Sequence, residues 1–181
     1  MTHEDASIAE LVWGPARQSV VSAQDFRLGM RRLAGACAIV TTGSRHEGRA
    51  SWAGLTATAI SSVSADPPRL LVCVNRGVWA HGQIAGTGSI GVNVLGKSGE
   101  ALAMRFAGGK CTPQEKFAEG RWLTNVTGAP LLADAIAAFD CHVAEIVAAS
   151  SHDIFICDIL AVRATAETGQ PLIYFDGGFL P

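Results

Sequence analysis

The chain has 181 residues, of which 49% are hydrophobic and 17% charged, and its formal net charge at pH 7 is −2. This length suits one domain with a large core, and so apolar a composition leaves surface for a subunit interface. Lysine and arginine form no cluster along the chain, which argues against nucleic acid as a partner.

The first 24 residues are predicted to form an arm ahead of a domain that spans residues 25–181. This arm contains acidic residues and no apolar segment, which excludes an ordinary secretory signal. No apolar run in the chain is long enough to cross a bilayer, so we expect no membrane partner. The five cysteines are widely spaced and odd in number. That pattern fits reduced thiols in a cytoplasmic protein better than a disulfide framework.

One helix is predicted near the start of the chain, over residues 24–33. Ser22 and Asp25 form a candidate capping box, and apolar residues from Phe26 to Leu33 recur at helical spacing. Segments rich in β-formers follow, each bounded by Gly, Pro, Asp or Ser. They cover residues 37–42, 54–68, 70–75, 89–95, 139–149, 154–163 and 172–175.

Two shorter helices are predicted among these strands, at residues 79–85 and 100–107, and a third at 131–138. Helices that are inserted among strands, instead of alternating with them, argue against a doubly wound parallel sheet. We therefore expect a mainly β fold, an antiparallel barrel with a few peripheral helices.

The run from Gly54 to Pro68 is the most informative segment, because small and hydroxyl residues follow one another along a predicted strand. Small residues let a flat ligand approach the main chain, and hydroxyls can bond a polar edge or a phosphate. Pro67 and Pro68 are expected to end the strand and start a turn. We call residues 54–68 the platform and interpret it as a ligand-binding surface.

Three other motifs lack the context that their chemistry needs. Residues 86–91 match the dinucleotide-binding fingerprint, but here a helix precedes them and a strand follows, which reverses the required order. Ser151, His152 and Asp153 are consecutive on an extended segment, so they point in alternate directions and do not predict a hydrolase relay. No pair of Cys or His has the spacing of metal ligands, and we expect no metal.

In order and spacing, these segments resemble those of the short-chain flavin reductases. The domain of that family is a split antiparallel β-barrel that binds FMN. Its members are the reductase partners of two-component flavin monooxygenases. The resemblance runs from Phe26 to Phe179. It is carried by His81 and by residues 26–35, 41–42, 56–68, 74–76, 92–95, 105–107, 128–131, 151–155 and 171–175.

The resemblance implies that an isoalloxazine ring lies on the platform, where main-chain groups and hydroxyls bond its polar edge. The implied contacts are Thr56, Ala57, Thr58 and Ala59. The flavin phosphate is expected near Ser61, Ser62 and Val63, with Arg76 as its cation. The other implied cofactor-binding residues are Asn75, Asn93, Arg105, Phe106 and Ala107.

His152 is the implied catalytic residue, beside the flavin where the nicotinamide docks. It would orient the carboxamide or hold local charge without moving a proton. Simpler interpretations remain, since Arg76 also fits an exposed strand-end arginine and His152 a turn histidine. Gly77 and Trp79 depart from the residues usual in the family, and the bulk of Trp79 would favour FMN over FAD.

The sequence thus predicts a homodimeric reductase that uses NADH or NADPH to reduce FMN, with FAD as the alternative flavin, and that supplies a separate monooxygenase. Three alternatives stay open. One is a reductase of the same fold that acts on a bound cobalt corrinoid, and another is a flavin-binding module without catalysis. The third is a pyridoxal-phosphate or haem binder built on a related barrel.

Overall fold

The computed structural model describes residues 21–108, 111–165 and 169–181. By its internal contacts the chain divides into two units, with the division between Leu33 and Ala34. The first unit holds α1 (Ala23–Met30), and the Ser22 side chain caps it by accepting a hydrogen bond from the main-chain N–H of Asp25 at 3.1 Å. Ser22 is confirmed as the N-cap, but the Asp25 carboxylate accepts from the Ser22 hydroxyl at 2.7 Å, which is not the main-chain bond of a full capping box. The helix ends before residue 33. Most of the predicted arm lies outside the described residues, and the boundary at residue 24 stays a prediction.

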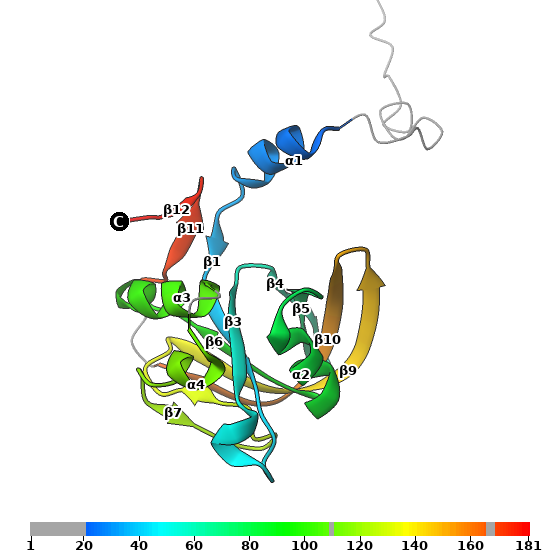
Figure 1. Ribbon diagram of the computed structural model, residues 1–181, viewed down its shortest axis with the longest axis vertical. Helices are drawn as coiled ribbons and strands as arrows, with labels where there is room; N and C mark the ends of the chain where they lie inside the picture. Colours follow the sequence, from blue (N-terminus) through cyan, green and yellow to red (C-terminus); the bar gives the residue numbers. More distant parts are fainter. Residues whose placement is uncertain (1–20, 109–110, 166–168) are drawn as a thin grey trace, which may run out of the picture. The chain divides into compact units, whose positions relative to one another are not determined.

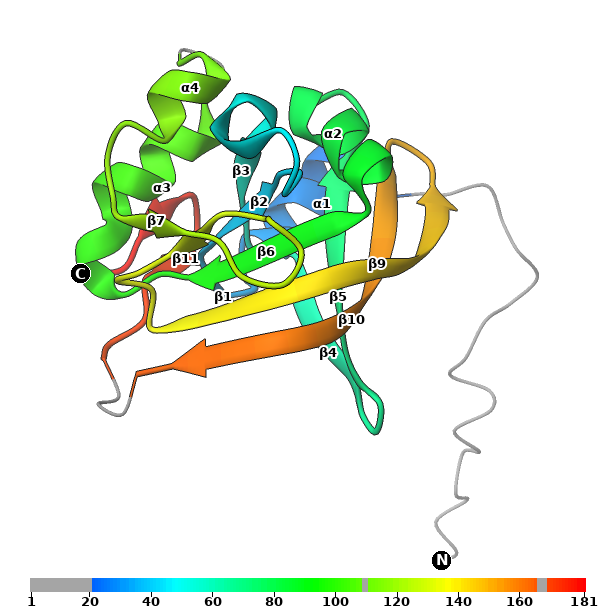
Figure 2. The ribbon, with the colours of Figure 1, turned by 90° about the horizontal axis from the view of Figure 1, so that it is seen from below.

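A sheet of seven strands dominates the second unit, in the order β3-β2-β6-β9-β10-β5-β4 (Figure 1). Every neighbouring pair in it is antiparallel. Figure 2 shows β9 and β10, in yellow and orange, as a long hairpin. The strands are β2 (Ala38–Thr42), β3 (Ala53–Ala57), β4 (Ile60–Ala65), β5 (Pro68–Asn75), β6 (Ser89–Val94), β9 (Ala137–Ala149) and β10 (His152–Ala164).

Smaller elements complete the second unit. A three-stranded sheet is made by β1 (Gly35–Ala36), β11 (Ile173–Phe175) and β12 (Gly178–Phe179), and a two-stranded one by β7 (Trp122–Leu123) and β8 (Leu131–Leu132). The helical elements are η2 (Gly48–Ser51), α2 (Trp79–Thr87), η3 (Lys97–Gly99), α3 (Glu100–Ala107) and α4 (Pro113–Lys116). Both α3 and α4 pack against β3, whereas α2 packs against β2 and β3.

The platform is not a single strand. It breaks at Thr58 and Ala59 into β3 and β4, which are the two opposite edges of the seven-stranded sheet. Because only two residues separate Ala57 from Ile60, the chain brings these two edges within about 11 Å of each other. The sheet therefore curls round on itself and stays open between its edges, as a split barrel requires.

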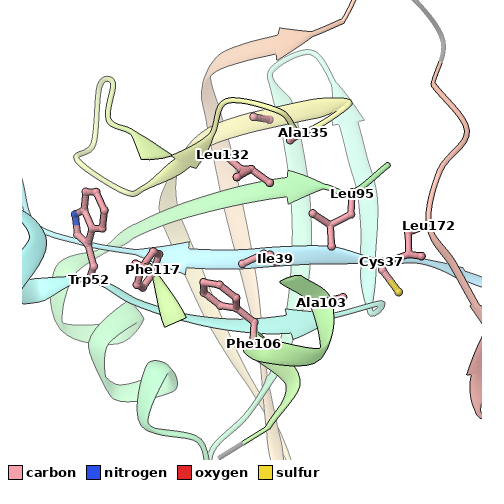
Figure 3. Packing of buried hydrophobic residues seen from close by; sticks show 11 residues of the cluster. Cys37, Ile39, Trp52, Leu95, Ala103, Phe106, Phe117, Leu132, Ala135 and Leu172 are labelled. Atoms are coloured by element: carbon pink, nitrogen blue, oxygen red, sulfur yellow. The ribbon is translucent and has the colours of Figure 1, made fainter. Parts of the chain in front are cut away.

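β2 is buried along its whole length because its two faces belong to two different hydrophobic clusters. Ile39 packs in the cluster of Figure 3, with Phe106 of α3 and with Phe117, whose ring centroid lies 5.1 Å from that of Phe106. Val40 points to the other face and packs in the cluster that contains Phe155 of β10. This alternation follows from the two-residue period of a strand. The first cluster fixes α3 beside β3.

The helix predicted over residues 131–138 is wrong. These residues form β8, a turn and the start of β9, because their main-chain groups bond other strands. The Leu132 N–H donates to Asn93 Oδ1 at 2.7 Å, and the Ile136 N–H donates to the Val94 carbonyl at 3.0 Å. Apolar spacing alone does not reveal such distant acceptors.

The glycine-rich segment that matches a dinucleotide fingerprint is a turn from helix to strand, as predicted. α2 ends at Thr87, Gly88 takes the left-handed conformation with φ 66°, and β6 begins at Ser89. A left-handed glycine is a common way to end a helix. No helix N-terminus therefore follows these glycines.

Candidate active site

A cavity of about 790 Å³ opens between β3, β5, α2 and the segment after α3. Its size is that of a typical small-molecule site, roughly 300–1,000 Å³. The predicted residues that line it are Thr56, Ala57, Thr58, Ala59, Asn75, Phe106, Ala107 and His152. Lining residues that the sequence reasoning missed include Cys73, Cys111, Pro113 and Lys116. The structure thus brings the first half of the platform, the end of β5 and the start of β10 around one space.

The main-chain wall of this cavity is β3. In the described part of the chain, β2 pairs with one side of β3 and no strand pairs with the other. Alternate N–H and C=O groups along such an edge stay available to a ligand. The hydroxyl of Thr56, by contrast, donates to the Ala103 carbonyl at 2.6 Å and holds α3 against the strand. A flat ligand with donors and acceptors along one edge can therefore bond β3 through its main chain.

Lys116 is the only lysine or arginine among the described residues that lines this cavity. Its Nζ donates to the Phe106 carbonyl at 3.1 Å and lies 3.5 Å from the Gly54 carbonyl oxygen. None of the salt bridges in the described ranges involves it. Burial lowers the pKa of the ammonium group, and the nearby Cys111 opposes this shift only in part. An anion that enters the cavity meets an uncompensated cation.

α4, which ends at Lys116, was detectable in the sequence. Thr112 and Glu115 form a complete capping box, and Pro113 occupies the first turn between them. These three residue types in this spacing are a standard helix start. Recognising them would have placed Lys116 at the end of a short helix that follows α3.

Arg76 does not line the cavity. Its guanidinium donates to Asp153 Oδ1 from Nε at 2.8 Å and from Nη2 at 2.5 Å. This pairing raises the pKa of Arg76 and lowers the pKa of Asp153. The cation that the sequence favoured for a phosphate therefore already has a carboxylate partner.

Arg105 and the three platform residues predicted near the phosphate also lie outside the cavity, whereas Phe106 and Ala107 line it. Arg105 forms an ion pair with Glu119 and donates to the Glu115 carbonyl at 3.2 Å. The break at Thr58 and Ala59 places the second half of the platform on β4, the other edge strand of the sheet. The platform residues predicted near the phosphate lie on that strand. The exposed residues there are Ser61, Ser62 and Val63.

Asn93, which was predicted to bind the cofactor, does not line the cavity. Its side chain is fully buried, away from the cavity. The amide Nδ2 donates to the Ile39 carbonyl at 3.0 Å, and Oδ1 accepts from the Leu132 N–H. Both ends of the amide are used to hold β2, β6 and β8 together, so Asn93 is a structural residue.

His152 begins β10 and lies at the cavity opposite Asn75 of β5, its partner in the ladder. Its Nδ1 lies 2.9 Å from Ser151 Oγ. The neighbouring Asp153 carboxylate bonds the side chains of Arg76 and His81, and not His152. The three consecutive residues thus form no relay.

Among the described residues, no group of three or more His, Cys, Asp and Glu side chains is placed to hold a metal ion. The expected absence of a metal stays a prediction. None of the helices in the described ranges is long and apolar enough to cross a membrane.

Comparison with known proteins identifies the family. Residues 30–181 match the flavin reductase like domain. The chain belongs to the flavin reductase like family. It is 43% identical over 157 residues to the FMN reductase (NADH) RutF of Variovorax paradoxus, which covers 87% of this chain and 84% of that protein. The protein of the same name from Bradyrhizobium diazoefficiens is 45% identical over 159 residues, or 88% of this chain and 85% of the relative.

Solved structures of flavin reductases agree with this assignment. A Haemophilus somnus protein solved as a candidate flavin reductase has a TM-score of 0.82 at 33% identity, over 88% of this chain and 99% of that one. BorF, the flavin reductase component of a bacterial two-component tryptophan halogenase, has a TM-score of 0.79 at 30% identity, over 88% and 97%. The family, the split-barrel fold and the flavin reductase activity predicted from the sequence are confirmed.

Proposed function

We propose that this flavin reductase uses NADH to reduce FMN and passes the reduced flavin to a separate monooxygenase. The cavity carries the proposal, because an unpaired strand edge and an uncompensated lysine line the same space. The relatives named FMN reductase (NADH) support the two substrates, and the halogenase component BorF supports delivery to a second enzyme. The five free cysteines support a cytoplasmic location.

The lining residues suit FMN. Ala57 and Ala59 leave room beside the main chain of the platform, and the free edge groups of β3 match the alternating donors and acceptors of a flavin ring. We assign the phosphate to Lys116, because a partly buried ammonium without a carboxylate favours a dianion. The flavin ring and the phosphate are thereby assigned to different parts of the same cavity, the edge of β3 and Lys116.

FMN, when bound, accepts a hydride from the reduced nicotinamide. The protein has to align the two rings and exclude water from between them. We assign this alignment to His152, whose position on the lining next to Asn75 lets it bond the nicotinamide carboxamide. It needs to exchange no proton for that role.

We further propose that FMN is preferred over FAD. Trp79 lines the cavity with an exposed fraction of 54%. An indole at this position reduces the room for the adenylate arm of FAD, whereas FMN ends at its phosphate.

We also propose that the protein is a homodimer. The hairpin of β9 and β10 carries four large exposed apolar residues, Ile146, Val147, Leu160 and Val162. Single exposed apolar side chains are ordinary, but several on one hairpin favour a covered surface. Sedimentation equilibrium should give twice the chain mass of 18.8 kDa. A monomer at every concentration would contradict the proposal.

Anaerobic stopped-flow spectroscopy tests the function. When the protein with bound FMN is mixed with NADH, the absorbance of the oxidised flavin should be lost in a single turnover. His152→Ala should slow this reduction by roughly tenfold, equivalent to about 1.4 kcal/mol of barrier, and leave the Kd of FMN unchanged. His142→Ala is the matched control, because His142 is exposed on β9 and does not line the cavity.

Three outcomes contradict the proposal. Absence of bleaching by NADH would leave a flavin-binding module without catalysis. Turnover that requires a cobalt corrinoid would indicate a different acceptor. Equal effects of the two histidine variants would remove His152 from the site.

A further inference from the structure

A cluster of three hydrogen-bonded polar side chains, Asp153, Arg76 and His81, lies behind the cavity wall, on β10, on the turn between β5 and α2, and on α2. Asp153 is at its centre: Oδ1 accepts from Arg76 Nε and Nη2 at 2.8 and 2.5 Å, and Oδ2 lies 2.8 Å from His81 Nε2. The Asp153 side chain is only 10% exposed and that of His81 17%. The carboxylate is thus largely removed from water, where charge-assisted hydrogen bonds are strongest.

Along the chain, the members of the cluster alternate with residues that line the cavity. Asn75, Gly77 and Trp79 line it, and so does His152. Arg76 lies between the first two, and His81 and Asp153 each follow a lining residue in sequence. The same short segments therefore present one set of residues to the ligand and another set to Asp153.

Few main-chain bonds fix the turn between β5 and α2. The Arg76 N–H donates to the Ser151 carbonyl at 3.0 Å, and the Val78 N–H donates to the Asn75 carbonyl at 3.3 Å. Farther along, the His81 ring packs edge-on against Phe155 with centroids 5.4 Å apart. Asp153 adds the side-chain bonds that join the turn and the first turn of α2 to β10.

We propose that Asp153 is a positioning residue for hydride transfer: through Arg76 and His81 it holds the wall formed by residues 75–80 in register with His152. This inference rests on the proposed function, because His152, which pairs with Asn75 of that wall, is assigned to the nicotinamide. It gives Arg76 a role other than phosphate binding. Loss of the carboxylate leaves Arg76 and His81 without their shared acceptor, and the wall that carries Trp79 keeps only its main-chain bonds to the segment of His152.

The test compares Asp153→Asn, Arg76→Gln and the double variant by anaerobic stopped-flow. The measured quantity is the rate constant for reduction of bound flavin at saturating NADH, with FMN and with riboflavin, which lacks the phosphate. Each single variant should lower this rate constant by roughly tenfold for both flavins. The double variant should be no slower than either single variant, because residues that act as one unit are not additive.

A matched control is available on the same two strands. Arg69 of β5 pairs with Asp158 of β10 at 2.6 Å, and neither residue lines the cavity. Asp158→Asn should leave the rate constant unchanged. Thermal unfolding of both Asn variants separates a loss of stability from a loss of positioning. Should Asp153→Asn not fold, His81→Ala, which removes the bond to Asp153 Oδ2, and Arg76→Gln give the same comparison.

The proposal is overturned if Asp153→Asn behaves like Asp158→Asn, if the two single effects multiply in the double variant, or if Arg76→Gln weakens FMN and spares riboflavin. The last result would make Arg76 a phosphate ligand. Failure of the proposed function is distinguishable from all of these, because the wild-type protein itself would then not bleach FMN with NADH.

Discussion

Two cations, Lys116 and Arg76, lie close to the cavity in different surroundings. Lys116 lines the cavity, donates only to main-chain carbonyls and has a pKa lowered by burial. Arg76 follows a lining residue but is bound to Asp153, and its own pKa is raised by that hydrogen bond. One charge is left for a ligand, whereas the other is neutralised within the fold.

The difference teaches that the partner of a cation decides its role. A charge beside a carboxylate contributes to the arrangement of its own elements, and it offers a ligand little net potential. A partly buried charge without a counter-ion is costly until an anion arrives, which favours binding. Arginine is the better phosphate ligand in general, yet here the lysine has the suitable environment.

The largest expected effect comes from Lys116→Gln. Loss of a charge-assisted bond to the phosphate should raise the Kd of FMN by roughly 30-fold, or about 2 kcal/mol, and leave the Kd of riboflavin unchanged. Fluorescence titration measures both constants. Lys97→Gln is the control, since Lys97 is exposed and outside the cavity. Equal weakening of FMN and riboflavin by Lys116→Gln would show that the lysine supports the fold and not the phosphate.

A smaller effect is expected from pH. Because the pKa of Lys116 lies below its ordinary value of about 10.4, the free cation is lost as pH rises through that lowered pKa. The Kd of FMN relative to riboflavin should therefore increase with pH before ordinary lysines titrate. Lys116→Arg should abolish this increase, because arginine keeps its charge up to about pH 12. If the Kd of FMN relative to that of riboflavin stayed constant with pH in the wild type, Lys116 would not be a phosphate ligand.

The sequence was sufficient to predict the elements that depend on neighbouring residues alone. The predicted helix at residues 100–107 coincides with α3, and the helix-to-strand turn at residues 86–91 is present. The strand alternation that buries β2 on both faces is also local. By contrast, the break of the platform at Thr58 depends on which edge of a curled sheet each half joins. Composition does not record that choice, so one strand was predicted in place of two.

The site shows the same limit. Thr56, Ala57, Thr58 and Ala59 do line the cavity, because the family resemblance located the first half of the platform. The role of Arg76 depends on Asp153, which is 77 residues away in sequence. No local pattern joins those two positions, so the choice between a phosphate ligand and an internal ion pair needed the fold.

The smallest expected effect concerns Trp79, on the wall that Asp153 holds. If the indole limits the adenylate arm, Trp79→Ser should lower the preference for FMN over FAD by about threefold, roughly 0.7 kcal/mol. Trp79→Phe keeps an aromatic ring and should retain most of the preference. Competition titrations of the two flavins give the ratio directly. Because Lys116 is assigned to the phosphate position that both flavins share, Lys116→Gln should weaken both flavins and change this ratio little. If the FMN/FAD preference changed in Lys116→Gln and stayed unchanged in Trp79→Ser, selection between the flavins would depend on the phosphate site and not on Trp79.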